Sequence, residues 1–404
     1  MQPTDRKIDQ PWLRGGGVQQ VMQALAAGGG CARFVGGCVR DALFGRAVRD
    51  IDIATDLEPE TVMSLLIDAG LKYAPTGLDH GTVTAIADGQ GFEVTTLRHD
   101  VETDGRRAVV AFTDDWLADA QRRDFTMNAL YCDADGTLYD PVGGLDDIAD
   151  GRVRFIGDAD DRITEDFLRI LRFFRFHAWY GAGGLDAAGL DACARQKAGL
   201  TALSVERVRS EFLRLLEAPD PLPALQAMAD SGVLAVILPG DPDLAALARV
   251  VAVEQALGVP DAVRRLAALY CTRPDDVITL AGAWKMSNSE RKRLRGLRAD
   301  IVVQGIADRD ARAQIYRHGV QAFCDHLVLH TDAWAADAQL LWDLATGWDV
   351  PALPVSGRDV TRRGVAEGKQ IGEVLAMLED GWVAEDFIPT RQDLLDRLDG
   401  LLKD

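Results

Sequence analysis

Two aspartates separated by a single residue, Asp50 and Asp52, form the pair in this chain that is best suited to binding a divalent cation. The run from residue 50 to 54 alternates polar and apolar residues, which predicts a β-strand with both carboxylates on one face. Neighbouring carboxylates repel and raise each other's pKa, and a hard cation such as Mg²⁺ relieves that repulsion. Two such ions can clamp the attacking and leaving oxygens of a nucleotidyl transfer. Two solvated aspartates on an edge strand are the alternative interpretation.

Two adjacent glycines, Gly36 and Gly37, precede the acidic pair. They follow a predicted strand at residues 33–35 and open a predicted helix at 39–44, with Arg40 in its first turn. Glycines let backbone N–H groups approach a phosphate closely, and a helix N-terminus favours an anion. The order of strand, glycine turn, helix and acidic strand therefore favours a nucleotide site over a pair of solvated aspartates.

These residues and several later motifs resemble those of a known family. The segments 36–46 and 50–55 are similar to the GGxVRDxLLGR…DxDxAT signature of the bacterial CCA-adding enzymes and poly(A) polymerases, which are class II nucleotidyltransferases. Further motifs follow in the family's order and carry the resemblance over about residues 34–215: His80–Thr84, Phe92–Thr96, Asp119–Ala129, Asp140–Gly144, Glu165–Arg169 and Ser204–Glu211.

The resemblance implies a role for each motif. Asp50 and Asp52 would hold two Mg²⁺ ions. Glu93 would be either a third ligand or a residue that contacts the ligands without binding the metal. Asp119 to Asp124 would hold the triphosphate and check the ribose 2′-hydroxyl, while Asp166 and Arg169 would read the incoming base. The nucleotide-binding residues expected on this basis are Gly36, Gly37, Arg40, Asp119, Arg122, Arg123, Asp124, Asn128, Asp166, Arg169, Arg172 and Arg175.

Base reading by Asp166 and Arg169 is chemically sound. An aspartate accepts a hydrogen bond from the exocyclic amino group that C and A share, and an arginine donates to the ring acceptors beside it, whereas U and G present a different pattern. The alternative comes from spacing alone. Asp166, Arg169, Arg172 and Arg175 recur every third residue, as in an ion-pair ladder on a solvated helix face.

Two basic segments could contact RNA. One is the cluster of Arg291, Lys292, Arg293 and Arg295, which stands out in a chain of net charge −19 and is expected to bind the phosphate backbone. The other is the segment 98–115, expected to be a mobile loop, which contains Arg98, Arg106 and Arg107. It matches in position the family's flexible loop, which helps to switch from C to A addition. A solvated helix face and a plain surface loop are the respective alternatives.

Composition and periodicity set the architecture. The chain has 404 residues, 48% of them hydrophobic, with six scattered cysteines, no apolar run that could span a bilayer and no secretory signal, so a reduced, cytoplasmic protein is expected. Strand and helix signals mix up to about residue 150, and helical periodicity dominates afterwards. We therefore expect an α+β nucleotidyltransferase head, a small mixed sheet with helices, at 18–155, followed by an all-α neck at 156–220, body at 221–345 and tail at 346–404.

The expected activity is template-independent addition of CMP and AMP, from CTP and ATP, to the 3′ end of tRNA, with the acceptor stem as the bound partner. A poly(A) polymerase shares every head motif, although the acidic end of this chain argues against it. An enzyme that adds only CC or only A, a catalytically silent RNA-binding module and an antibiotic nucleotidyltransferase are further alternatives. We expect no His-Asp phosphohydrolase activity and no membrane association, and the oligomeric state stays open.

Overall fold

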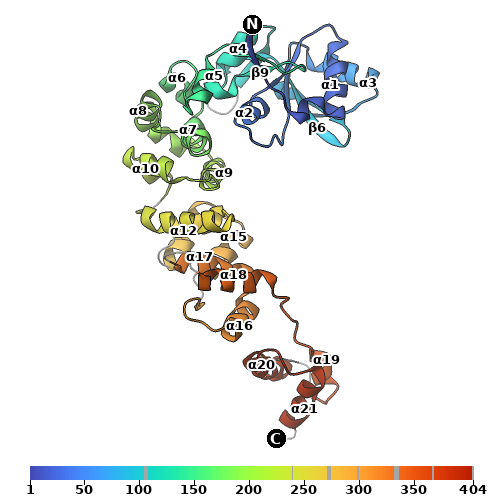
Figure 1. Ribbon diagram of the computed structural model, residues 1–404, viewed down its shortest axis with the longest axis vertical. Helices are drawn as coiled ribbons and strands as arrows, with labels where there is room; N and C mark the ends of the chain where they lie inside the picture. Colours follow the sequence, from blue (N-terminus) through green and yellow to red (C-terminus); the bar gives the residue numbers. More distant parts are fainter. Residues whose placement is uncertain are drawn as a thin grey trace. The chain divides into compact units, whose positions relative to one another are not determined.

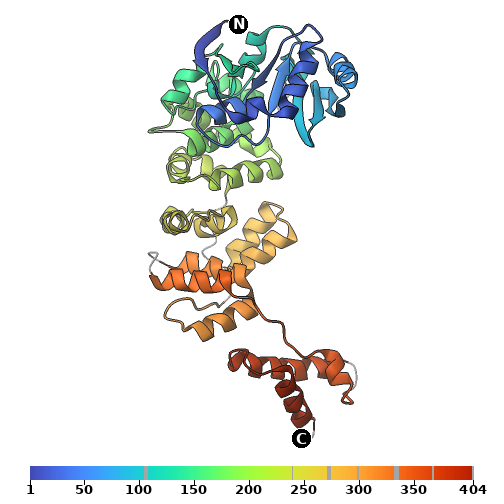
Figure 2. The ribbon, with the colours of Figure 1, turned by 45° about the vertical axis from the view of Figure 1, so that its right-hand side comes forward.

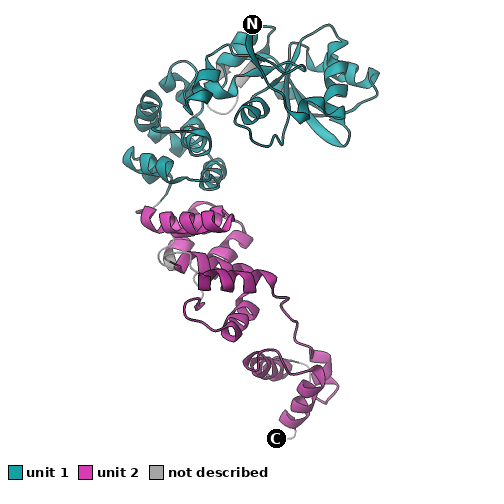
Figure 3. Cartoon of the chain, in the orientation of Figure 1, with its two compact units in different colours: residues 1–240 teal, residues 241–404 magenta. Residues whose placement is uncertain are grey.

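The computed structural model describes residues 1–103, 108–238, 240–270, 274–297, 300–331, 336–365 and 368–402. The chain forms two compact units, Met1–Gly240 and Asp241–Asp404 (Figure 3). The finer division into head, neck, body and tail stays a prediction.

Unit 1 is built on an eight-stranded sheet in the order β1-β10-β9-β2-β3-β6-β5-β4. The pairing of β3 with β6 is parallel and the other described pairings are antiparallel, so the sheet is mixed, as predicted. Strand β3 begins at Asp52 and not at the expected Asp50. The strands are β1 Pro3–Lys7, β2 Ala32–Val35, β3 Asp52–Thr55, β4 Lys72–Gly77, β5 Thr82–Ala87, β6 Gln90–Thr96, β9 Tyr131–Cys132 and β10 Thr137–Tyr139.

Helices cover the sheet because alternate strand residues are apolar. Helices α1 (Gly16–Ala26) and α3 (Pro59–Asp68) pack on one face (Figure 1), in a core that includes Leu25, Leu66, Ile53 and Phe92. A second cluster joins Ala54 and Tyr131 to Trp116 of helix α4. The other elements before the neck are η1 Pro11–Arg14, α2 Gly37–Leu43, η2 Leu78–His80, α4 Trp116–Gln121, η3 Thr126–Asn128 and α5 Gly144–Ala149.

The segment expected to be a mobile loop contains a β-hairpin instead. Strand β7 (Arg98–Thr103) pairs with β8 (Ala108–Phe112) in a separate two-stranded sheet. The run Ala108–Phe112 is apolar and rich in β-branched residues, and this strand preference outweighs the polar character of the segment as a whole. Arg106 and Arg107 lie outside the described residues.

The neck is helical, as predicted, but the single helix expected at 164–180 is two helices. Asp166 separates them with an extended backbone (φ −153°, ψ 105°), and its carboxylate accepts a hydrogen bond from the Leu168 N–H. Aspartate at such a position competes with the helix for backbone donors, so it interrupts the helix, and the N-cap position of the next helix is Phe167. The remaining elements of unit 1, of which the last two fall within the predicted body, are α6 Ala159–Glu165, α7 Leu168–Tyr180, α8 Ala187–Gln196, η4 Lys197–Ala202, α9 Val205–Leu216, α10 Leu222–Asp230 and α11 Val233–Ile237.

In unit 2 all the described elements are helices (Figure 2). Two predicted helices differ from the structure. The helix expected at 287–304 ends at Gly296, and the one expected at 309–327 is divided at Gly319, whose φ of +87° a helix interior does not allow. The helices are α12 Leu244–Leu257, α13 Ala262–Tyr270, α14 Pro274–Ala283, α15 Asn288–Gly296, α16 Asp308–His318, α17 Val320–His330, α18 Ala336–Gly347, α19 Gly357–Thr361, α20 Lys369–Ala384 and α21 Arg391–Leu401. Among the described residues, none of the helices has the length and apolar character needed to cross a bilayer.

Candidate active site

Three carboxylates gather at one end of the central strands. Asp52 opens β3 directly opposite Glu93 of the parallel strand β6, and Asp50 is exposed just before β3. Burial raises the pKa of Asp52 to about 6, and the charges of Glu93 and Asp50 add to this, while Arg123 and Arg40 act in the opposite direction. The structure therefore brings the expected pair and Glu93 close enough to interact, and their role as metal ligands stays a prediction.

The donor chemistry fits a hard divalent cation, since carboxylate oxygens are what Mg²⁺ prefers and a raised pKa marks repulsion that a cation relieves. Within the described ranges, no group of three or more His, Cys, Asp and Glu side chains is arranged so that it could hold a metal ion. These carboxylates would therefore need oxygen ligands from a substrate to complete a coordination shell.

The glycine turn lies against an arginine. Gly36 precedes helix α2 with φ +73° and ψ −123°, a conformation that favours glycine. A Cβ added there would lie 3.6 Å from Nη1 of Arg123. The Gly36 N–H already donates to the Leu130 carbonyl, so the closeness of the Arg123 guanidinium, a group that binds phosphate oxygens well, is what the turn offers to a phosphate.

Asp119 orients two arginines through hydrogen bonds to their guanidinium groups. Its carboxylate accepts hydrogen bonds from Arg122 Nε (2.8 Å), Arg123 Nη2 (3.0 Å) and the Tyr131 hydroxyl (2.8 Å). Burial by itself would raise the pKa of Asp119, but Arg123 and Arg122 lower it to about 2. At 1% exposure, Asp119 is placed to fix the two guanidinium groups, which are themselves partly exposed, and not to touch a ligand directly.

Asp124 is fully engaged by protein donors. Oδ1 accepts from the Phe125 N–H and from Asn128 Nδ2, both at 2.9 Å, and Oδ2 accepts from Arg172 Nε (2.8 Å) and Nη2 (2.5 Å). Although burial opposes it, the Arg172 charge holds the pKa of Asp124 well below its usual range. These bonds use the four lone pairs of the carboxylate, so a contact with a ribose hydroxyl would have to replace one of them.

Arg40, Arg172 and Arg175, all expected to bind nucleotide, have partners within the protein. Arg172 pairs with Asp124 as described, and Arg175 donates from Nε to Glu211 of α9 at 2.6 Å. The pair of Arg172 with Asp124 joins the predicted head to the predicted neck, and the pair of Arg175 with Glu211 joins two helices of the predicted neck.

Arg40 is buried at 8% exposure and bridges two elements. It donates to Asn128 Oδ1 (2.6 Å), to the Tyr180 hydroxyl at the end of α7 (2.8 Å) and to Asp41 Oδ1. Direct nucleotide contact by Arg40 stays a prediction that would require some of these bonds to be exchanged.

The two residues expected to read the base are held separately. Asp166 accepts from the Leu168 N–H (3.0 Å) through Oδ1 and from Arg207 Nη2 (2.7 Å) through Oδ2. Arg169 donates to the Arg162 carbonyl (2.8 Å) and to Glu165.

The ladder that the three-residue spacing suggested does not form along α7. Asp166, Arg172 and Arg175 each pair with a residue from outside this helix, and Arg169 pairs with Glu165 at the end of α6. The spacing therefore reflects contacts with surrounding elements and not a solvated face.

The sequence analysis did not identify four residues that bind the expected site residues directly, namely Tyr131, Arg162, Tyr180 and Arg207. Arg162 is buried and donates to the carbonyls of Arg122 and Arg123, the latter at 2.8 Å, as well as to Glu165. It thereby connects the segment that carries the two arginines to α6. Partners so distant in sequence give no local signal.

The four basic residues expected to bind RNA in unit 2 differ in their surroundings: two have partners within the protein and two are exposed. Arg291 donates to the Met286 carbonyl (2.9 Å), and Arg293 donates to Asp325, whose side chain is fully buried and requires a positive partner. Lys292 and Arg295 are both exposed on the same helix. Contact with an RNA backbone would therefore depend on Lys292 and Arg295 more than on the other two.

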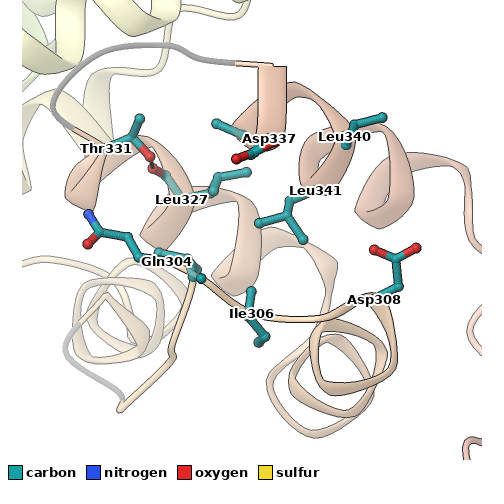
Figure 4. A pocket seen from close by; sticks show the side chains of 11 residues that line it. Gln304, Ile306, Asp308, Leu327, Thr331, Asp337, Leu340 and Leu341 are labelled. Atoms are coloured by element: carbon teal, nitrogen blue, oxygen red, sulfur yellow. Dashed lines mark hydrogen bonds between the residues drawn. The ribbon is translucent and has the colours of Figure 1, made fainter.

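Unit 2 also contains a cavity of about 420 Å³ between α16, α17 and α18 (Figure 4). Leu327 and Leu341 contribute apolar surface, and Asp308 and Asp337 contribute acidic groups. None of its eleven lining residues is basic, so this cavity offers no cationic side chain to a phosphate.

Comparison with known proteins gives consistent results. A family model described as the poly A polymerase head domain matches residues 32–154, and one described as a probable RNA and SrmB-binding site of polymerase A matches residues 185–246. A mitochondrial CCA tRNA nucleotidyltransferase 1 of Danio rerio is 35% identical over 376 residues, which cover 91% of this chain and 86% of that protein. A CCA-adding enzyme of Geobacillus kaustophilus is 37% identical over 277 residues, 66% of each chain.

Solved structures agree with this. The Bacillus stearothermophilus CCA-adding enzyme in complex with CTP matches with a TM-score of 0.73 at 27% identity, covering 98% of both chains. A Thermotoga maritima CCA-adding enzyme complexed with tRNA matches with a TM-score of 0.65, and at 19% identity this likeness concerns the fold alone.

Proposed function

The chain belongs to the family of CCA tRNA nucleotidyltransferases, and from this membership we infer that it adds C, C and A to the 3′ end of tRNA from CTP and ATP. The observation that carries the inference is the placement of Asp52 opposite Glu93, beside Asp50 and within the field of Arg123. Acidic groups next to a triphosphate-binding arginine are what nucleotidyl transfer requires.

The carboxylates of Asp50 and Asp52 would hold Mg²⁺, with Glu93 next to them. Mg²⁺ bound there would neutralise charge on the attacking and leaving oxygens of the transfer. With a pKa near 6, Asp52 is mostly ionised at pH 7 and above, and it can then act as a ligand. Phosphate oxygens of the nucleotide would supply the ligands that the protein lacks.

Arg122 and Arg123 would bind the triphosphate. Asp119 fixes both guanidinium groups, and a guanidinium fork matches two phosphate oxygens. The turn at Gly36 lies next to Arg123, and backbone N–H groups of the residues after Gly36 would be further donors. Because these groups touch only the part that CTP and ATP share, a single site would serve both nucleotides.

Asp166 and Arg169 would read the base. Asp166 is 27% and Arg169 14% exposed in their side chains, so each retains surface that a ligand can reach. Arg169 also lies 3.4 Å from the Arg122 carbonyl through Nη2, which brings the base-reading pair close to the triphosphate segment. This proximity supports recognition of base and triphosphate in one site.

Sequencing of reaction products tests the proposal. The purified protein is incubated with Mg²⁺ and a tRNA that lacks its last three nucleotides, first with each nucleoside triphosphate alone and then with CTP and ATP together. We expect C, C and A to be added in order and the reaction to stop there. Long A tails, or equal activity on an unstructured RNA, would point to the poly(A) polymerase alternative, and addition of only CC or only A would indicate a partial enzyme.

The cytoplasmic location expected from the sequence stays a proposal, since some curated relatives carry a mitochondrial name. Fractionation of cells that express the tagged protein would test it.

A further inference from the structure

The carboxylate of Asp166 is fixed at both oxygens by groups from two different helices. Oδ1 accepts from the Leu168 N–H at the start of α7, and Oδ2 accepts from Nη2 of Arg207 in the first turn of α9, at 2.7 Å. The torsion that orients a carboxylate is broad when only one oxygen is held. The second contact therefore decides which direction the remaining lone pairs face.

Arg207 occupies a position in α9 where the helix dipole disfavours a positive charge. It is in the first turn of α9, and a cation near a helix N-terminus opposes the helix dipole. Asp166 lies at the start of α7, where a negative charge is favourable. The contact between helices, and not a preference within α9, accounts for the position of the arginine.

The helix that carries Arg207 is itself held firmly against α7. Arg175 donates to Glu211 at 2.6 Å, and Trp179 donates from Nε1 to the Arg214 carbonyl at 2.7 Å. Phe212 adds buried apolar contact. The guanidinium of Arg207 thus starts from a helix pinned at two further points along its length.

We propose that Arg207 is a positioning residue that sets nucleotide specificity by orienting the Asp166 carboxylate toward the exocyclic amino group of C and A. The proposal rests on base reading by Asp166 as proposed above. Arg207 acts through Asp166, so its removal should relax the choice of base while nucleotide and tRNA binding change little. Its side chain is 30% exposed, and the fold should tolerate its replacement.

The test uses the full-length protein and a tRNA that ends just before the added triplet. The ratio of kcat/KM for CTP to that for UTP is measured for the wild type, Arg207→Ala, Arg207→Lys, Asp166→Ala and the double variant of Asp166→Ala with Arg207→Ala. Arg209→Ala is the matched control, because it removes a guanidinium from the same helix at a position two residues further along, which faces a different direction.

We expect Arg207→Ala to lower the ratio about two- to tenfold, the range for removal of one oriented hydrogen bond, and Arg207→Lys to restore part of it. The double variant should match Asp166→Ala alone, because Arg207 has no effect without its partner. Arg209→Ala should keep the wild-type ratio. The KM for tRNA and the unfolding midpoint report any general damage, and if Arg207→Ala does not fold, Arg207→Gln takes its place.

Two results would overturn the inference while leaving base reading intact: an unchanged ratio in Arg207→Ala when Asp166→Ala lowers it, or effects that multiply in the double variant. An unchanged ratio in Asp166→Ala would instead remove the proposed base reading itself, and the inference with it.

Discussion

Replacing Asp52 with asparagine should stabilise the protein in the absence of divalent cations. The pKa of Asp52 is raised in the folded protein to about 6 from an ordinary value of 3.8. At about 1.4 kcal/mol per unit, the ionised side chain costs the folded state at most about 3 kcal/mol, and solvent screening of this partly exposed group lowers the figure to about 1–2 kcal/mol. Asparagine has nearly the same shape and carries no charge, so the variant avoids this cost.

The sign of the pH dependence follows from the raised pKa. Between about pH 4 and pH 6 the folded protein binds more protons at Asp52 than the unfolded chain does, so the wild type loses stability relative to the variant as pH rises through this window. Above it the difference is constant. The advantage of Asp52→Asn at pH 5 should therefore be about half of that at pH 8.

Urea unfolding of both proteins at pH 5 and pH 8, in EDTA and in excess Mg²⁺, provides the measurement. Mg²⁺ should stabilise the wild type more than the variant at pH 8, because only the wild type keeps the full set of carboxylates. Asp5→Asn, which removes a charge from an exposed position on β1, is the control and should show neither effect. If Asp52→Asn is less stable than the wild type in EDTA at pH 8, or if its advantage does not vary with pH, the view of a repelling carboxylate cluster is incorrect.

Three further changes have distinct expected outcomes. Asp166→Ala should reduce the preference for CTP over UTP by about tenfold to a hundredfold, because a buried unpaired polar group costs about 1–3 kcal/mol; kcat/KM for each nucleotide measures this, and an unchanged ratio would exclude base reading. Replacing Lys292 and Arg295 with glutamine should weaken tRNA binding and reduce the slope of log Kd against log salt by about 0.9 for each duplex phosphate that is no longer neutralised, whereas an unchanged slope would show that both are merely solvated. Gly36→Ala should destabilise the protein by about 1–3 kcal/mol, because φ +73° with ψ −123° is a backbone conformation that other residues rarely adopt, and an unchanged midpoint of thermal unfolding would contradict this.

The sequence was most informative where the relevant contacts are local. The spacing of Asp50 and Asp52 and the glycine turn at Gly36 could be interpreted without a fold, because strand alternation and turn chemistry act over a few residues. Asp119 and Arg123 are four residues apart, so their pairing is also a short-range feature.

Contacts between distant segments could not be predicted in the same way. Asp124 and Arg172 are 48 positions apart and Asp166 and Arg207 are 41 apart. The first pair meets only where α7 lies against the segment before η3, and the second only where the start of α7 lies against α9. Likewise, the sequence does not distinguish Arg293 from its exposed basic neighbours, although Arg293 forms an ion pair with the buried Asp325. Charge patterns along a chain do not show which side chains face a buried counter-charge.

The most direct test of the account is single-turnover incorporation by Asp50→Ala and Asp52→Ala, measured with CTP on a tRNA that lacks the triplet and with ATP on a tRNA that ends in CC. Because one carboxylate cluster is proposed to serve both additions, each variant should lose CMP and AMP incorporation together while its affinity for tRNA remains close to that of the wild type. Loss of only one nucleotide in either variant, or full activity in both, would contradict a single catalytic site at Asp50 and Asp52.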